Sequence, residues 1–223
     1  MGTTSQTAET DTANLLRLVF EGFKRENVFY VVPRGYDELP AWNGKDLDLL
    51  VARADLGEAI GIIRRACDAA GFAVISSSPD DGHGIELCAL SINTGGAEVL
   101  SFDIRYLLAI ELTGKNVLRR KIPVAQLRRR ELSQNACSFY TLDAIDEFLA
   151  TLRQFLLKRL AGNAEKAEFY KDRLQTLLRQ PAAAQWLASQ RLGAEEVKRM
   201  LASGVSQVQA ALCALADARW GES

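Results

Sequence analysis

The chain has 223 residues, of which 48% are hydrophobic and 25% are charged, and its formal net charge is −1. That length and balance predict a globular protein with its own core, built as one large domain or two small ones. The near-neutral charge excludes a uniformly basic nucleic-acid-binding chain, and no apolar run approaches the ~18 residues of a membrane-spanning helix.

The first half of the chain alternates helix and strand signals. Apolar spacing predicts a helix over 12–25, and FYVVPRG (29–35) predicts a short strand that ends in a Pro-Arg-Gly turn. A polar connector, 36–45, leads to a second predicted strand, DLDLLV (46–51). Helical periodicity then covers 55–70.

Three more strands are predicted before the character of the chain changes. They cover 72–77, 85–92 and 98–107, and the Asn-Thr-Gly-Gly sequence between the last two is typical of a hairpin turn. We expect no strand after about residue 125, where strand periodicity ends.

The second half of the chain has helical periodicity. One helix is predicted over 142–160 and a second over 164–179, and three more follow, separated near Gly193 and Gly204. The expected fold is therefore α+β, with an N-terminal mixed-sheet domain followed by a C-terminal helical bundle.

We place the mixed-sheet domain at 12–130 and the helical domain at 140–220. Residues 1–11 are small and polar, lack the basic and apolar regions of a signal peptide, and are expected to be disordered.

The cysteines lie far apart among apolar or small residues, which favours reduced thiols over structural disulfides or a zinc site. They are Cys67, Cys88, Cys137 and Cys213. We expect a cytoplasmic protein without membrane contact.

Two carboxylates share one face of the predicted strand 46–51. Side chains alternate along a strand, so Asp46 and Asp48 point one way while Leu47 and Leu49 point the other. Like charges this close repel each other and are costly to desolvate without a cation between them. The pair therefore either faces solvent, where charge opposes aggregation at a sheet edge, or holds a cation.

Asp103 is a third candidate, because it lies in the apolar sequence VLSFDIRY, where an unpaired charge would be costly. If its strand is a neighbour of 46–51, Asp103 converges on the pair. Three carboxylates supply the oxygen ligands that Mg²⁺ prefers, and such a trio can seat one ion beside an attacking hydroxyl and another beside a leaving group. The alternative is a core carboxylate paired with Arg105 or another basic residue.

Residues around the connector could hold a nucleotide. Gly35 lets backbone N–H groups approach a phosphate closely, and Arg34 or Lys45 could add charge-assisted contacts. Trp42 could stack on a base or pack within its loop. The single histidine, His83, lies in PDDGHGIE without a Gly-x-Ser-x-Gly motif, so a polar loop role is favoured over a catalytic triad.

These motifs carry a resemblance to a known superfamily. The order of a strand, Arg34-Gly35, a ten-residue spacer, the Asp-Leu-Asp strand and a later apolar strand with Asp103 resembles the polymerase-beta-like nucleotidyltransferases. More closely, YVVPRGYDELPAWNGKDLDLLV and the later AEKAEFYKDRL look like small nucleotidyltransferase-fold proteins of bacterial surface-polysaccharide gene clusters. The resemblance covers roughly residues 15–110, and the helical tail more loosely.

The resemblance implies transfer of a nucleoside monophosphate from a nucleoside triphosphate to an acceptor hydroxyl or phosphate, with Mg²⁺ or Mn²⁺ as cofactor. The resemblance leaves four acceptor classes open: a small molecule, a sugar phosphate, a protein or an RNA end. The implied catalytic and metal-binding residues are Asp46, Asp48 and Asp103, and the implied nucleotide-binding residues are Arg34, Gly35, Tyr36 and Lys45.

Tyr36 departs from the superfamily pattern, which has Gly or Ser at that position. Its ring could stack on a base or sugar, or it could block a phosphate position. A non-catalytic binding or regulatory protein of the same fold is therefore an alternative. A glycosyltransferase with an Asp-x-Asp motif is less favoured, because only one predicted strand precedes Asp46.

Basic residues form two clusters, 119–121 and 128–130, on either side of IPVAQL. They could contact a polyanion such as a triphosphate, a phosphorylated acceptor or RNA. Proteins that bind single-stranded nucleic acid stack its bases on aromatic side chains, and no aromatic residue lies among these arginines. We therefore favour a solvated face for both clusters.

Overall fold

The computed structural model describes residues 11–40, 46–80, 82, 84–93, 96–110, 120–135 and 137–221. It divides into two compact units, which we treat separately. The sheet unit contains the described residues up to Leu107 together with Pro123–Ala125 and Arg129–Thr141. The helical unit contains the described residues of Leu108–Ile122, Gln126–Arg128 and those from Leu142 onward. Among the described residues, no helix combines the length and the apolarity needed to cross a bilayer.

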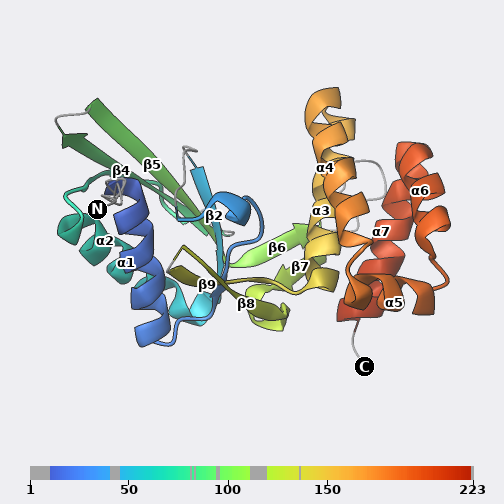
Figure 1. Ribbon diagram of the computed structural model, residues 1–223, viewed down its shortest axis with the longest axis horizontal. Helices are drawn as coiled ribbons and strands as arrows, with labels where there is room; N and C mark the ends of the chain where they lie inside the picture. The colour runs from blue at the N-terminus through green and yellow to red at the C-terminus, as the bar shows by residue number, and fades with distance from the viewer. Residues whose placement is uncertain are drawn as a thin grey trace, which may run out of the picture. The chain divides into compact units, whose positions relative to one another are not determined.

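A five-stranded mixed sheet forms the centre of the sheet unit (Figure 1). Its order is β1-β2-β5-β4-β3, in which β2 and β5 run parallel and the other neighbours run antiparallel. The prediction of a mixed sheet is confirmed. The strands are β1 (Tyr30–Val31), β2 (Asp46–Val51), β3 (Ala73–Ser77), β4 (Gly84–Asn93) and β5 (Gly96–Arg105).

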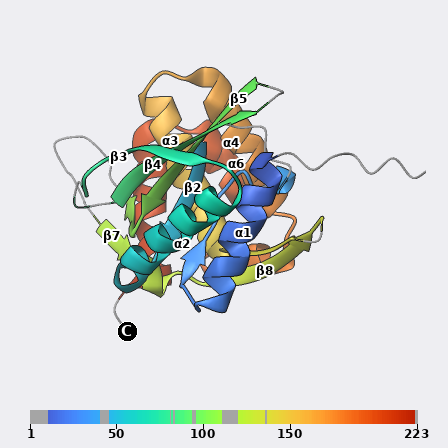
Figure 2. The same cartoon turned by 90° about the vertical axis from the view of Figure 1, so that its left-hand side faces the viewer.

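Two helices, α1 (Asp11–Arg25) and α2 (Leu56–Ala69), pack side by side against one face of this sheet (Figure 2). The buried residues of α1 recur at helical spacing, from Leu15 and Leu16 through to Phe23, so one stripe of the helix is apolar. These side chains join those of α2 and of the covered sheet face in one core cluster. That packing leaves the opposite face of the sheet for polar side chains.

Two further strand pairs follow the sheet. β6 (Leu107–Ile110) pairs with β7 (Arg120–Pro123), and β8 (Arg129–Gln134) pairs with β9 (Cys137–Leu142). The expectation of no strand after about residue 125 is therefore wrong. β8 has the polar sequence RRELSQ, and none of its side chains is fully buried, so it lacks the apolar alternation by which a strand is recognised.

The helical unit contains α3 (Ala144–Leu160), α4 (Ala164–Leu177), α5 (Pro181–Ser189), α6 (Ala194–Ala202) and α7 (Val205–Trp220). The carboxylate of Asp143 caps α3 by accepting hydrogen bonds from the backbone N–H groups of Ile145 and Asp146. Asn163 caps α4 in the same way, through the backbone N–H of Lys166. α3 and α4 are also joined by Arg173, which donates twice to the buried Glu147.

Candidate carboxylate site

Alternation along β2 divides its side chains between the two faces of the sheet. Leu47, Leu49 and Val51 are at most 1% exposed and belong to the core shared with α1 and α2. Asp46 and Asp48 point to the opposite face, where Asp46 is exposed and Asp48 is half-buried. The two aspartates therefore share the sheet face that the helices leave uncovered.

β5 places Asp103 directly beside Asp48. The two strands are parallel neighbours, and Asp48 is the register partner of Asp103, while Asp46 is the partner of Ser101. Neighbouring strands lie ~4.8 Å apart, so the two carboxyl groups on one face are near neighbours. β2 and β5 thus meet the condition on which convergence of the three aspartates depended.

Two arginines neutralise this pair of carboxylates. The guanidinium of Arg34 makes a bidentate contact to the carboxylate of Asp48: Nε donates to Oδ2 at 2.6 Å and Nη2 donates to Oδ1 at 2.9 Å. Arg105, two residues beyond Asp103 on the same face of β5, donates from Nε to Asp103 Oδ1 at 2.6 Å. The sequence-based alternative of an Asp103–Arg105 pair is therefore present, and a similar pair holds Asp48.

Sequence reasoning missed a fourth carboxylate on this part of the sheet. Glu86 of β4 is the register partner of Asp103, and its Oε1 accepts a hydrogen bond of 2.8 Å from the hydroxyl of Ser101. Glu86, Asp103 and Asp48 therefore follow one another across three adjacent strands. The signal that singled out Asp103, a carboxylate inside an apolar strand, was also present for Glu86 in IELCALSI. We call Asp46, Asp48, Asp103 and Glu86 the carboxylate row.

The electrostatic surroundings raise the pKa of Asp103 above its ordinary value of 3.8. Partial burial is the main cause, because it penalises the charged carboxylate. Arg105 opposes the shift, whereas the negative charges of Asp48 and Glu86 add to it. Asp103 is accordingly a better proton acceptor than an isolated aspartate.

The turn after β1 is held in place from β8. Gly35 has a φ of 69°, a left-handed conformation that glycine adopts without steric cost. The ring of Tyr36 is 4% exposed and belongs to the core, and its hydroxyl accepts a hydrogen bond of 3.3 Å from Arg130 Nη2. Gln134 donates to the backbone carbonyls of Tyr36 and Leu39. These contacts fix the backbone that carries Arg34.

The second basic cluster packs within the protein rather than forming a purely solvated face. The guanidinium carbon of Arg129 lies 4.0 Å from the ring centre of Tyr140 and 4.3 Å from that of Phe29. Arg130 supports Tyr36, as described above, and the backbone N–H of Arg128 donates to Asp146 in the helical unit. In the first cluster, Lys121 is exposed. Lys45, Trp42, His83 and Arg119 lie outside the described residues.

The donor chemistry of the row suits Mg²⁺, because every member offers carboxylate oxygens. In the structure, Asp48 and Asp103 are paired with arginines. Within the described parts of the chain, no three His, Cys, Asp or Glu residues are gathered closely enough to hold a metal ion. Asp48 and Asp103 would become metal ligands by exchanging a guanidinium for the ion, while Asp46 is already at the surface.

Comparison with known proteins gives a structural similarity but no sequence match. No protein family and no curated protein matches the sequence. Among solved structures, the chain is similar to an antigenic nucleotidyltransferase-like protein from Paracoccidioides brasiliensis. The two chains are 10% identical, with a TM-score of 0.46, and the similarity covers 77% of this chain and 76% of that one.

Proposed function

We propose that the sheet unit is a nucleotidyltransferase, which moves a nucleoside monophosphate from a nucleoside triphosphate to an acceptor hydroxyl or phosphate. One observation carries the proposal: Asp48 and Asp103 face each other on adjacent parallel strands, on the sheet face that also bears Asp46. The sequence resemblance assigns the catalytic role to the same three residues. Mg²⁺ is the proposed cofactor.

Arg34 and Gly35 are the proposed phosphate-binding residues. The guanidinium of Arg34 already makes a bidentate contact to a carboxylate, and a phosphate presents a comparable pair of oxygens to the same fork. Anchoring of the Tyr36–Leu39 backbone by Gln134 keeps the adjoining turn in a defined conformation. A triphosphate could then be held without first ordering this segment, which lowers the entropic cost of binding.

Asp46, Asp48 and Asp103 would hold the metal, which, when bound, would polarise the phosphate and offset its negative charge. In the reaction, the acceptor oxygen forms a bond to the α-phosphorus, the bond from that phosphorus to the β-bridging oxygen breaks, and pyrophosphate leaves. For a hydroxyl acceptor, the proton passes to the carboxylate of Asp103.

A second candidate function is a nucleotide-binding protein without transferase activity. The arginine pairs favour it, because Arg34 and Arg105 supply positive charge where a catalytic site would place metal ions. On this alternative, the carboxylates balance the arginines and serve the fold rather than the chemistry.

Two measurements test these functions. The first is thermal unfolding with Mg²⁺ and ATP or CTP. Wild-type protein should be stabilised by about 2.7 kcal/mol at a ligand concentration 100 times Kd. Asp48→Asn should lose that stabilisation. Asp68→Asn, at an exposed position of α2, is the matched control and should retain it. No stabilisation of the wild type by either nucleotide contradicts both functions.

The second measurement is release of pyrophosphate from Mg²⁺–ATP and Mg²⁺–CTP, with glucose 1-phosphate and a short RNA as acceptors. Release that requires Asp48 and Asp103 supports the transferase. Nucleotide-dependent stabilisation without release from any combination supports the binding protein instead.

A further inference from the structure

A pocket of about 330 Å³ lies within the helical unit, and none of the residues used in the proposed reaction lines it. The end of α3, one side of α4 and the end of α6 line it, and it is open to solvent. Its volume is within the ~300–1,000 Å³ of small-molecule sites. Phe155, Ala167 and Leu201 supply apolar walls, and all three side chains are otherwise buried in the bundle. A ligand with an apolar ring would remove their remaining exposed surface from water.

Arg159 is held in a fixed orientation at this pocket. Its Nη1 donates to the backbone carbonyls of Leu201 at 3.3 Å and Ser203 at 2.8 Å, at the end of α6. Its guanidinium carbon also lies 5.5 Å from the ring centre of Phe155. Among the described residues, no partner is found for its Nε and Nη2 groups. The guanidinium therefore keeps donors for an anion and needs little reorganisation to use them.

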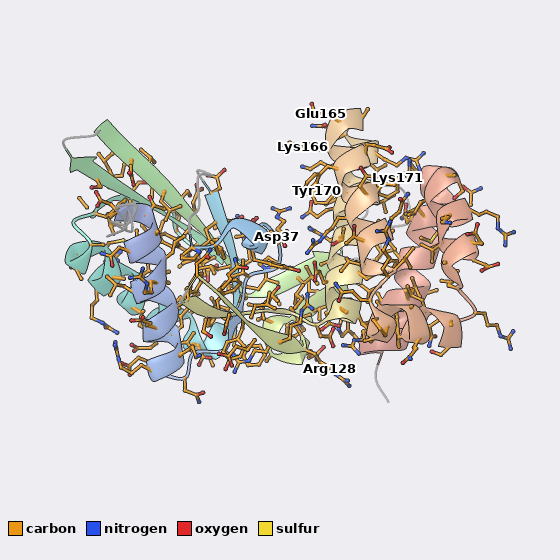
Figure 3. The ribbon with its side chains drawn as sticks, viewed as in Figure 1. Asp37, Arg128, Glu165, Lys166, Tyr170 and Lys171 are labelled. Carbon is orange, nitrogen blue, oxygen red and sulfur yellow. The ribbon has the colours of Figure 1, made fainter. Side chains whose placement is uncertain are left out.

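Lys171 adds a second positive charge to the lining. In Figure 3 it lies on the side of α4 toward α6, whereas Lys166 lies on the opposite side of the helix. Lys171 Nζ is 2.6 Å from Glu168 Oε1, and the Glu168 side chain is 61% exposed. Exposed ion pairs of this kind contribute little net free energy, so Lys171 can turn to a stronger anion at small cost. Two cations and one carboxylate leave the lining with a net positive charge.

We propose that this pocket binds a small organic anion, a carboxylate or phosphate group carried on an apolar body about the size of a benzene ring. Arg159 and Lys171 contact the anionic head, and the apolar body lies against Phe155 and Leu201. The arrangement fits an anion better than a neutral ligand, because a neutral ligand would cover the two cationic groups without supplying a negative charge. The site is independent of the carboxylate row and of the proposed transferase activity.

Calorimetric titration of the full chain with phenyl phosphate, benzoate and neutral benzyl alcohol tests this proposal. At least one anion should bind ten-fold or more tightly than the alcohol, and the tighter anion identifies the head group. Its affinity should fall with added salt. If neither anion binds, or if the alcohol binds as tightly, the proposal is overturned.

Variants locate the site. Lys171→Gln should weaken binding of the anion several-fold, and Ala164→Phe should abolish it by filling the pocket beside the start of α4. Lys166→Gln is the matched control and should bind normally. Neither lysine takes part in the backbone contacts of Arg159, and circular dichroism of both variants checks that they fold. Equal effects of the two lysine variants, or loss of binding in Asp48→Asn, would contradict the assignment.

Discussion

Asp103 lies between two other carboxylates in the row that crosses β2, β5 and β4. Its register partners are Asp48 on one side and Glu86 on the other, and Arg105 is the cation that contacts it. Its pKa is raised by burial first and by its two negative neighbours second, against the pull of Arg105. The pKa of Asp103 therefore depends on the charges of Asp48, Glu86 and Arg105.

We expect carboxyl-carbon NMR titration to give Asp103 a pKa above 3.8. Glu86→Gln should lower that pKa, since it removes a neighbouring negative charge, and Arg105→Gln should raise it further, since it removes the opposing positive charge. Asp68→Asn serves as the control and should leave it unchanged. A pKa that stays constant in Glu86→Gln would show that the row is not electrostatically coupled.

The same shift has a defined effect on stability. Because the folded-state pKa lies above the unfolded value, the folded protein binds more protons in the interval between them. The stabilising contribution of Asp103 is fully present below pH 3.8 and is lost as the pH rises through the folded pKa. Asp103→Asn should remove this decline from the pH profile of the unfolding free energy.

Sequence reasoning found the three aspartates of the site, but it missed the pairing of Arg34 with Asp48 and the neighbouring Glu86. Asp103 stood out because its apolar strand made a charge conspicuous, and alternation alone placed Asp46 and Asp48 on one face. The Arg34–Asp48 fork was not predictable, because no spacing rule links residues that are joined only by the turn geometry between β1 and β2. Glu86 was within reach of the same reasoning once its strand was paired with β5.

At the scale of elements, the packing of α1 on α2 depends on a missing side chain. A Cβ atom at Gly22 of α1 would lie 2.5 Å from Cγ2 of Ile62 on α2. Ile62 is 2% exposed, and its branched side chain has few alternative rotamers, so it cannot move aside freely. The two helices therefore approach each other over this glycine.

Gly22→Ala should destabilise the protein by ~1–3 kcal/mol through overpacking, although alanine is the better helix former. Gly57→Ala in the first turn of α2 is the matched control: its Cβ would meet nothing within 4 Å, and the change should stabilise by ~0.5–1 kcal/mol. Urea unfolding followed by circular dichroism measures both. The same sign for the two substitutions would contradict close packing at Gly22.

Elements were predictable where apolar spacing was strong. Helix α1 and strand β2 show this best, because the buried residues of α1 recur at helical spacing and alternate leucines of β2 are buried. β8 and β9 were missed because they form a two-stranded pair whose outer strand is mostly polar. β9 does alternate, with Cys137, Phe139 and Thr141 buried, but it is short and leads into α3 almost at once.

At the scale of the whole molecule, a buried ionic network in the helical unit joins residues that are far apart in sequence. Arg219, near the end of α7, contacts Asp143 and Asp146 at the start of α3, each at 2.6 Å. Asp146 is completely buried and also accepts a hydrogen bond from the backbone N–H of Arg128. Removing one charge from such a network leaves the others buried without compensation.

Arg219→Met should therefore destabilise the helical unit by ~3–5 kcal/mol, measured by urea unfolding. Arg199→Met on α6 is the matched control, because Arg199 is 76% exposed and forms only a surface pair with Glu196. The control should change stability by less than ~0.5 kcal/mol. Adding Asp146→Leu to Arg219→Met should recover part of the loss, and failure to recover any would show that packing rather than charge explains it.

The fork between Arg34 and Asp48 makes each partner the other's resident counterion. A divalent cation that reaches Asp48 alone breaks this ion pair, and so does a phosphate that reaches Arg34 alone. Only an ion and a phosphate arriving together exchange one ion pair for two. Such coupling is reciprocal, so each component raises affinity for the other by the same factor. The protein would then bind a free metal ion or a free phosphate weakly, and bind the metal–phosphate complex more tightly.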